Sequence, residues 1–237
     1  DTVSFLILKG IIVFYDAEHF FDAYNANPEY SLKCLLTAME AGAKAIILCD
    51  TNGGTLTSEI SRIVREIRPR INVVLGIHCH NDAGLAVANS IAAVQAGCDM
   101  VQGTINGYGE RCGNADLIPI IANLKIKLGL DCISDEKLKE LTHVSYFVSE
   151  ISNMKERNDQ PYVGLSAFAH KGGVHINAVM KNPKTYEHIE PMLVGNRRRM
   201  LVSELAGKTG ILIRAKDLNL DLSKGDPKTK KILTLIQ

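Results

Sequence analysis

The chain has 237 residues, 46% of them hydrophobic, and its 27 basic and 26 acidic side chains leave a formal net charge of +1. This balance is typical of a soluble protein with a sizeable core, and it gives no sign of a nucleic-acid or membrane partner. Because the apolar runs are too short for a bilayer span, no signal-peptide pattern opens the chain and the six cysteines lack paired spacing, we expect a cytoplasmic protein with reduced thiols.

Four short apolar runs recur along the first half of the chain. They occupy residues 11–15, 45–49, 73–77 and 100–104. Amphipathic stretches follow them: Asn27 and Pro28 can begin one helix that Gly42 ends, and others span residues 60–67, 85–96 and 116–128. Strands that alternate with helices about every thirty residues predict four βα units of a parallel sheet, which is half of an eightfold barrel.

The pattern changes near residue 130. Ser134 can cap a helix that continues to residue 151, whereas residues 153–195 show little periodicity. A short helical run over residues 200–205 and a charged helix from about Pro227 follow. We therefore predict an α/β protein with two domains, a half barrel over residues 1–131 and a helical linker or lid subdomain over residues 132–237.

The third apolar run leads into two histidines. If this strand continues through His80, its alternation sends His78 and His80 to one side and Cys79 to the other. A glycine-rich loop with Glu110 and Asn114 follows the next strand, where parallel sheets carry their chemistry. Two imidazoles with a side-chain oxygen nearby predict a divalent metal site. On the histidines alone, hydrogen bonding at the polar end of a strand stays an open alternative.

Other polar residues follow the first two strands or lie in the second half. Glu18 could contact substrate or belong to a solvated loop, and residues 50–54 could form a plain turn. His170 and His175 flank a pair of glycines, which suits a mobile active-site segment, although loop histidines are often structural. The arginines at 197–199 could steady a phosphate, but a solvated basic face is the simpler interpretation.

Three motifs together resemble the metal-dependent acyltransferases that include the isopropylmalate, homocitrate and citramalate synthases. They lie at residues 78–82, 107–114 and 168–175. The resemblance covers essentially the whole chain, and residues 15–21, 48–54, 181–186 and 194–199 are most similar to the citramalate synthase branch. It implies that residues 1–131 are the C-terminal half, about strands five to eight, of a TIM-barrel catalytic domain, and that the chain is an excised piece of a longer synthase.

The resemblance also implies a ligand set. His78 and His80 would bind a divalent cation, Mn²⁺, Mg²⁺ or Zn²⁺, and Asn114 would be a further oxygen ligand. Glu110 would hold the adjacent loop or contact bound substrate. An Arg-Asp pair that such enzymes carry on their first barrel strand has no counterpart here, so we expect the chain alone to bind metal weakly and to turn over little or nothing.

The remaining roles are implied in the same way. Glu18 and Thr51 match positions that line the 2-oxoacid and acetyl pocket, and His170 matches a residue behind the site. His175 matches a histidine that the helical subdomain brings over the centre, as the base, with Tyr186 as its neighbour.

The reaction implied is a Claisen-type condensation of acetyl-CoA with pyruvate, which gives citramalate and CoA for branched-chain amino-acid biosynthesis, in a homodimer. One alternative is 2-isopropylmalate or homocitrate synthase activity, or a related lyase that runs the carbon bond backwards. The other is that the chain is a dimerisation or regulatory piece with no catalysis of its own.

Overall fold

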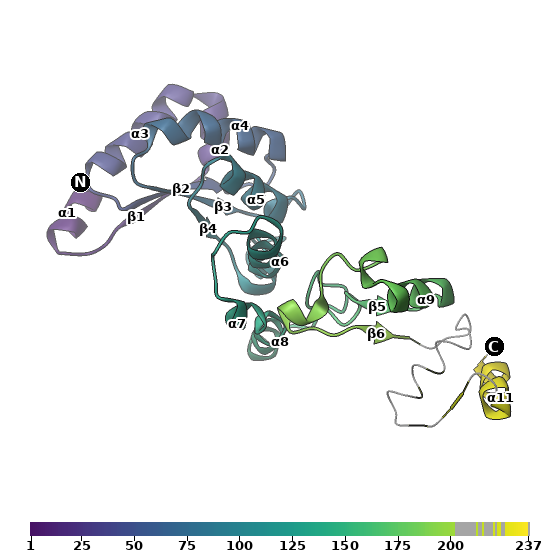
Figure 1. The fold of residues 1–237 in the computed structure, drawn as a ribbon. Helices are drawn as coiled ribbons and strands as arrows, with labels where there is room; N and C mark the ends of the chain where they lie inside the picture. Colours follow the sequence, from purple (N-terminus) through teal and green to yellow (C-terminus); the bar gives the residue numbers. More distant parts are fainter. Residues whose placement is uncertain (202–211, 213–214, 216–219, 221, 224–225, 237) are drawn as a thin grey trace. The chain divides into compact units, whose positions relative to one another are not determined.

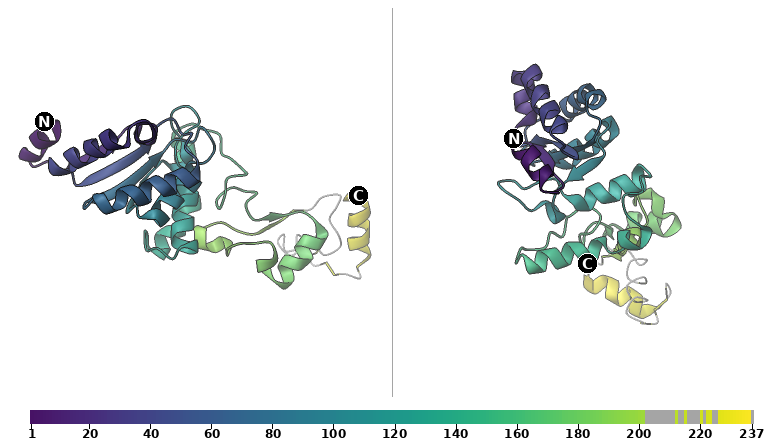
Figure 2. Two further views of the ribbon diagram at one scale, coloured as in Figure 1. Left: turned by 90° about the horizontal axis from the view of Figure 1, so that it is seen from above. Right: turned by 90° about the vertical axis from the view of Figure 1, so that its left-hand side faces the viewer.

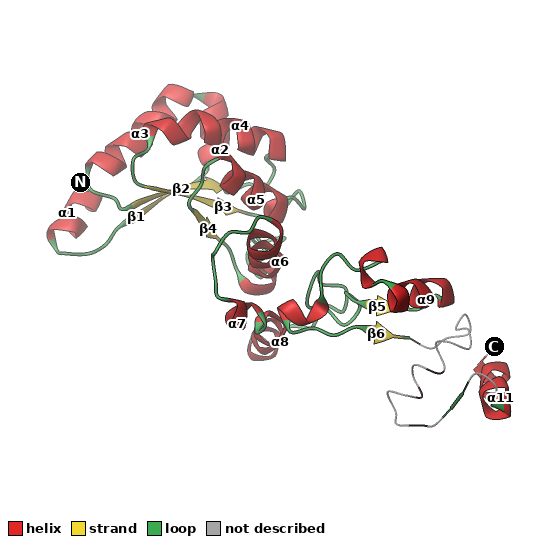
Figure 3. Cartoon of the chain, viewed as in Figure 1, coloured by secondary structure: helices red, strands yellow, loops and turns green. Residues whose placement is uncertain are grey.

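The computed structural model describes residues 1–201, 212, 215, 220, 222–223 and 226–236. The chain divides into two compact units, Asp1–Cys132 and Ile133–Gln237. The first is built on a parallel sheet, and the second is mainly helical (Figure 3). Within the described residues, no helix combines the length and the apolar character that a bilayer crossing requires.

The first unit consists of four consecutive βα units. Its parallel sheet has the order β1-β2-β3-β4, made of β1 (Phe14–Ala17), β2 (Ala45–Asp50), β3 (Val74–Cys79) and β4 (Met100–Gln102). Helices lie along one face of this sheet (Figure 1), and Figure 2 gives two further views. The helices are α1 (Thr2–Leu8), α2 (Phe20–Ala26), α3 (Pro28–Glu40), α4 (Thr57–Ile67), α5 (Ala86–Ala96) and α6 (Leu117–Ala122).

The predicted elements exist, but several of their boundaries were wrong. The first strand starts at Phe14, because Gly10 turns the chain after α1 with φ +76° and leaves Ile11 and Ile12 exposed. The fourth strand ends at Gln102, before a 3₁₀ turn at Ile105–Gly107. The helix predicted over residues 116–128 is α6 followed by a π-helical turn, Asn123–Lys127.

Alternation along the strands separates two faces of the sheet. On the helix-covered face, β2 and β3 contribute buried side chains to the core, each worth roughly 1.5–3 kcal/mol; among them are Ile46, Leu48, Leu75 and Ile77. On the opposite face, Ile47 packs with Cys49 and Met100. Ile47 lies beside Gly76 on β3, where an added Cβ would come within 2.4 Å of its Cδ1. A glycine there leaves room for the isoleucine.

This second face is concave. Gln102 on β4 donates a hydrogen bond to Asp16 on β1 at 3.3 Å, although β2 and β3 lie between the two strands. Contact between the outer strands means that the sheet curls as a barrel does. At the other end of the same face, Phe14 and Val74 are partly exposed. The expected fold class, half of a (β/α)₈ barrel followed by a mainly helical part, is confirmed.

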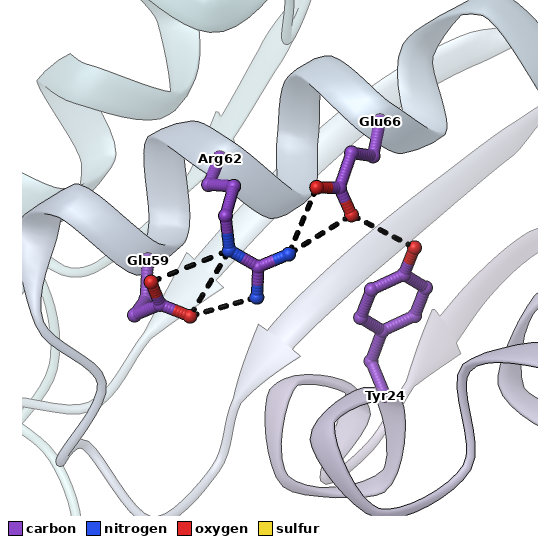
Figure 4. A network of polar contacts seen from close by, with 4 residues as sticks. All are labelled: Tyr24, Glu59, Arg62 and Glu66. Carbon is purple, nitrogen blue, oxygen red and sulfur yellow. Dashed lines mark hydrogen bonds and ion pairs between the residues drawn. The ribbon is translucent and has the colours of Figure 1, made fainter.

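A polar network ties two helices of the first unit together (Figure 4). Arg62 on α4 bonds Glu59 and Glu66 on its own helix, at 2.7 and 2.8 Å. The Tyr24 hydroxyl on α2 donates to Glu66 at 3.1 Å. The network connects neighbouring βα units on their outer surface, away from the concave face.

The second unit contains short elements. Its strands β5 (Ala169–His170) and β6 (Arg199–Met200) pair in parallel. Its helices are α7 (Asp135–Leu138), α8 (Leu141–Ile151), α9 (Gly173–Lys181) and α11 (Pro227–Ile236), with 3₁₀ turns at Pro183–Thr185 and Pro191–Val194.

Sequence patterns were less reliable in this unit. The helix predicted to reach residue 151 from Ser134 is interrupted between α7 and α8. Residues 153–195, where no helix was predicted, contain α9, since Ile176 and Val179 turn inward against Met200. Met200 itself lies in a strand rather than a helix, while residues 202–205 fall outside the described part of the chain. The predicted C-terminal helix is confirmed as α11.

Candidate metal centre

β3 carries both histidines of the predicted site to the concave face. His78 lies in register with Cys49 on β2 and with Gln102 on β4. His80 continues the line beyond the strand, its N–H bonded to the Asp50 carbonyl at 3.1 Å. The two imidazole centroids are 5.3 Å apart. As the alternation predicts, Cys79 points into the helix-covered core, where burial raises the pKa of its thiol.

Asn114 is brought opposite His80 by a short antiparallel bridge. Asn81 donates to Gly113 and Ala115 donates to Cys79, both at 2.9 Å, which makes His80 and Asn114 a non-hydrogen-bonded pair. In such pairs the Cα atoms are only about 4.5 Å apart and the side chains share one face. The amide therefore stands beside the imidazoles, although 34 residues separate it from His80.

Glycines shape the loop that holds Asn114. Gly107 and Gly113 have φ values of +69° and +89°, which L side chains rarely adopt. An added Cβ at Gly113 would lie 2.1 Å from the Gly107 carbonyl oxygen, which accepts a hydrogen bond from the Asn114 N–H at 3.0 Å. At Gly109 a Cβ would lie 2.9 Å from the Asn114 amide. The glycines of this motif let the backbone close around that side chain.

Three polar atoms at this point have no hydrogen-bond partner. Among the described residues, the buried side-chain atoms without one are Nδ1 of His78, Nδ1 of His80, Oδ1 of Asn114 and Nε of Arg199. Unpaired buried polar atoms are costly, so three of them on adjacent side chains suit the binding of a common partner. Imidazole nitrogens and an amide oxygen are donors that a divalent cation accepts. The residues present therefore fit a metal ion.

The surroundings of His78 favour its neutral form. Burial lowers the pKa of His78, and the nearby His80 lowers it further, against the opposing charges of Asp16 and Glu18. Neutral imidazole keeps the lone pair that a metal needs. Burial also raises the pKa of the Cys49 thiol to about 12, with help from the same two carboxylates. No group of three or more His, Cys, Asp or Glu side chains suited to a metal occurs in the described part of the chain.

The other predicted site residues of the first unit lie in loops at the same edge of the sheet. Thr51 follows β2, and its hydroxyl accepts a hydrogen bond from the His19 N–H at 2.7 Å. Glu18 and Glu110 are exposed, in the loops after β1 and β4. The segment from Asp50 onward is a turn, since the Asp50 carboxylate accepts from the Thr55 hydroxyl at 2.8 Å.

His175 and Tyr186 form a separate cluster in the second unit with His170. The rings of His175 and Tyr186 are 4.3 Å apart, and His170 lies 6.5 Å from the same tyrosine. His170 Nε2 is 3.0 Å from Glu187, which Arg198 also binds at 2.6 Å. Burial alone would raise the pKa of Glu187, but Arg198 and His170 outweigh it and lower this pKa. That His175 acts over the metal centre stays a prediction.

Sequence reasoning missed four charged residues around these clusters. Arg198 was interpreted as part of a solvated basic face, yet it pairs with the buried Glu187. Asp82 and Arg111 form an ion pair at 2.8 Å next to the metal motif. Both lie inside the recognised motifs, so opposite charges within the two loops were the available signal.

Comparisons with known proteins identify the family of this chain. The model of the HMGL-like family matches residues 16–148, more than half of the chain. The chain belongs to the HMGL-like family. A second model, described as homocitrate synthase post-HMGL domain-like, matches residues 162–236. The family expected from the three sequence motifs is therefore confirmed.

Individual relatives of this HMGL-like chain extend beyond it. It is 52% identical over 245 residues to an (R)-citramalate synthase from Synechocystis sp. and 52% identical over 237 residues to one from Geobacter sulfurreducens, and each match covers 100% of this chain and 45% of the relative. A 2-isopropylmalate synthase from Methanocaldococcus jannaschii is 36% identical and covers 94% of this chain and 42% of the relative. The chain thus spans somewhat less than half the length of these curated relatives.

The fold has a solved counterpart. The HMG-CoA lyase from Brucella melitensis superposes with a TM-score of 0.50 at 14% identity, covering 64% of this chain and 56% of that chain. At this identity the likeness concerns the fold alone.

Proposed function

We propose that this chain carries the metal-binding part of an acyltransferase that condenses acetyl-CoA with pyruvate to give (R)-citramalate and CoA. The observation that supports it most is the group of buried, unpartnered atoms on His78, His80 and Asn114. They lie at the carboxyl ends of barrel strands, where barrel enzymes place their chemistry. The choice of pyruvate rests on 52% identity to proteins named (R)-citramalate synthase, against 36% for a 2-isopropylmalate synthase.

The three side chains would hold a divalent cation, Mn²⁺, Mg²⁺ or Zn²⁺. When bound, such an ion supplies Lewis-acid polarisation of a ketone and stabilises negative charge on its oxygen. All three ligands are uncharged while the histidines are neutral, and among the described residues no group of three or more His, Cys, Asp or Glu side chains is arranged to hold a metal. We therefore expect weaker binding than at sites with carboxylate ligands, with coordination positions left for the oxygens of a 2-oxoacid.

Proton transfer would fall to His175. In this proposal its imidazole removes a proton from the acetyl methyl group, whose carbon then bonds to the ketone carbon of pyruvate. The ketone oxygen takes the displaced electron pair and a proton, and water cleaves the thioester to release CoA. Tyr186, 4.3 Å from His175 between ring centres, would orient the imidazole. Glu18 and Thr51 would line the pocket for the small acids, and Glu110 would contact bound substrate. His170, which is bonded to Glu187, would pack against Tyr186 and keep its ring in place.

The metal centre is tested by titrating this chain with Mn²⁺ and following the electron paramagnetic resonance signal of the free ion. We expect His78→Ala to weaken Mn²⁺ binding at least tenfold, because it removes one of three ligands. His143→Ala, which changes an exposed histidine on α8, is the matched control and should bind as the unaltered chain does. Equal affinity in both variants would refute the site.

The substrate is tested in a chimera in which this chain replaces the matching segment of the Geobacter sulfurreducens relative. Release of free CoA from acetyl-CoA is measured with pyruvate, 2-oxoisovalerate and 2-oxoglutarate. We expect the highest kcat/KM with pyruvate, and a preference for either larger acid would assign the chain to the related synthases. A chimera that binds Mn²⁺ but releases no CoA with any acid would favour the non-catalytic alternative. We also propose a homodimer, which sedimentation of the chimera tests.

A further inference from the structure

One side chain ties together three loops at the candidate metal centre. Arg111 donates through Nε and Nη2 to the two carboxylate oxygens of Asp82, at 2.8 and 3.0 Å. Its Nη2 also donates to the Thr51 carbonyl at 2.6 Å. Thr51 follows β2, Asp82 follows β3 and Arg111 follows β4. A single guanidinium therefore joins the ends of three consecutive βα units.

The surrounding backbone accommodates this contact closely. At Gly53 an added Cβ would lie 2.6 Å from Asp82 Oδ2 and 2.8 Å from the Asp82 amide nitrogen, so only glycine lets these loops approach. The Ala83 N–H bonds the Gly53 carbonyl at 2.9 Å. Arg111 has φ +56°, a conformation that non-glycine residues seldom adopt without a compensating contact. Its guanidinium contacts supply that compensation.

The contacts of Arg111 with Asp82 and Thr51, called the clamp below, lie next to two of the candidate ligands. Asp82 is two residues after His80, and Arg111 is three residues before Asn114. His80 and Asn114 face each other across the bridge that joins these loops. Because the Asp82 carboxylate is occupied by Arg111, it serves as an anchor for the loop rather than as a ligand. Release of Arg111 would remove the side-chain ties from the Asn114 loop to the loops after β2 and β3, and would leave the backbone bonds of the bridge.

We propose that Arg111 is a positioning residue, which holds the Asn114 side chain against His78 and His80 before a metal ion binds. The inference rests on the proposed metal centre. A fixed arrangement of ligands lowers the ordering that binding requires, so the clamp would raise metal affinity without touching the ion.

An ordinary surface ion pair is the competing explanation, and the chain offers a matched control for it. Arg62 on α4 is as exposed as Arg111, 45% against 41%, and also makes a bidentate contact with a carboxylate. Within the described part of the chain its hydrogen-bond partners are Glu59 and Glu66 of its own helix, and Tyr24 in turn bonds Glu66. Arg62→Ala therefore removes a comparable ion pair with no link to the ligands.

The test is Mn²⁺ titration of the 237-residue chain, with far-ultraviolet circular dichroism as the folding check. We expect Arg111→Ala to raise the Mn²⁺ dissociation constant about tenfold, the lower end of the range for direct partners of metal ligands, because Arg111 acts on Asn114 through the loop. Arg111→Lys keeps one of the contacts and should fall between this variant and the unaltered chain. Arg62→Ala should change nothing.

A double variant separates positioning from general loosening. If Arg111 acts through Asn114, Arg111→Ala should have less than about twofold effect when Asn114 is already alanine, because coupled residues are not additive. Unchanged Mn²⁺ affinity in Arg111→Ala would overturn the inference. So would an Arg111→Ala effect that is as large in the Asn114→Ala background as in the unaltered chain. If His78→Ala also left binding intact, the metal centre itself would fall. If Mn²⁺ binding weakens in His78→Ala but not in Arg111→Ala, the metal centre stands and only the positioning role of Arg111 is refuted.

Discussion

Replacing Gly113 with alanine should loosen the loop that carries Asn114. Gly113 has φ +89°, and a Cβ there would lie 2.1 Å from the Gly107 carbonyl oxygen. This is more than 1 Å inside an ordinary contact of about 3.5 Å. Because the obstacle is backbone, rotation of a side chain cannot relieve the overlap. The Gly107 carbonyl must move away from the Asn114 N–H that it accepts from.

The cost of this change has two parts. The left-handed conformation costs an L residue roughly 1–2 kcal/mol. Loss of the hydrogen bond to Asn114, with its groups left unsatisfied, adds about 1–3 kcal/mol. Gly129 isolates the first part, since it has φ +68° and nothing within 4 Å of an added Cβ. Gly113→Ala should therefore cost about 2–5 kcal/mol, and Gly129→Ala only about 1–2 kcal/mol.

Amide hydrogen exchange, measured by mass spectrometry on peptides that cover residues 104–117, reports the free energy of opening this loop. We expect faster exchange there in Gly113→Ala than in Gly129→Ala, together with weaker Mn²⁺ binding. Equal exchange in the two variants would mean that the loop accepts a Cβ, and the argument that glycines hold Asn114 in place would be wrong.

Three further changes test the core, the thiols and the second unit. Leu48→Ala should lower the free energy of urea unfolding by about 2–5 kcal/mol, because its side chain is fully buried. At pH 8, Cys112 should react with iodoacetamide while Cys49 does not, since burial raises the Cys49 pKa to about 12. The pKa of Glu187 is lower in the folded protein than its unfolded value of about 4.3. Its carboxylate therefore stabilises the folded state above about pH 4.3, and this stabilisation is lost as the pH falls through the folded-state pKa. Arg198→Ala should therefore shift acid unfolding, followed by ellipticity, to higher pH.

Each of these expectations has a control within the chain. Leu8→Ala removes an exposed leucine and should cost less than about 0.5 kcal/mol, so a similar loss in both leucine variants would contradict the core assignment. Cys132 is exposed and should react as Cys112 does, and mass spectrometry of modified peptides distinguishes these sites. Glu187→Gln should abolish the effect of Arg198→Ala on the acid transition; a shift that persists would place its origin elsewhere.

The sequence could predict the parallel sheet because its central strands are short apolar runs that recur between amphipathic helices, and both signals are local. It failed where tertiary context decides. Ile11 and Ile12 are apolar but exposed, so the first strand was placed too early. In the second unit, α9 contributes few buried side chains, among them Ile176 and Val179, and its glycine-rich start concealed the helix.

In the candidate site, too, local patterns predicted some features and tertiary contacts decided the others. The shared direction of His78 and His80 follows from period two and needed only the strand. The place of Asn114 opposite His80 depends on a bridge between distant segments, which the family resemblance suggested and no local pattern contains. Arg111 and Glu187 were missed because their importance lies in partners distant in sequence, Thr51 and Arg198 respectively. Long-range polar contacts of this kind leave no periodic signal.

Because side chains alternate along β3, the number of residues in this strand decides which of them face the concave side of the sheet. A one-residue deletion absorbed before His78 would turn both imidazoles into the helix-covered core and present the Cys79 thiol to the concave face. The two candidate nitrogen ligands would then be replaced by one sulfur ligand, which would leave a metal without a complete set. Insertions and deletions among relatives should therefore accumulate in the loops around β3 and avoid residues 74–80. If the proposed metal centre is right, a gap in that segment would identify a relative whose side chains at this position bind a different ion or none.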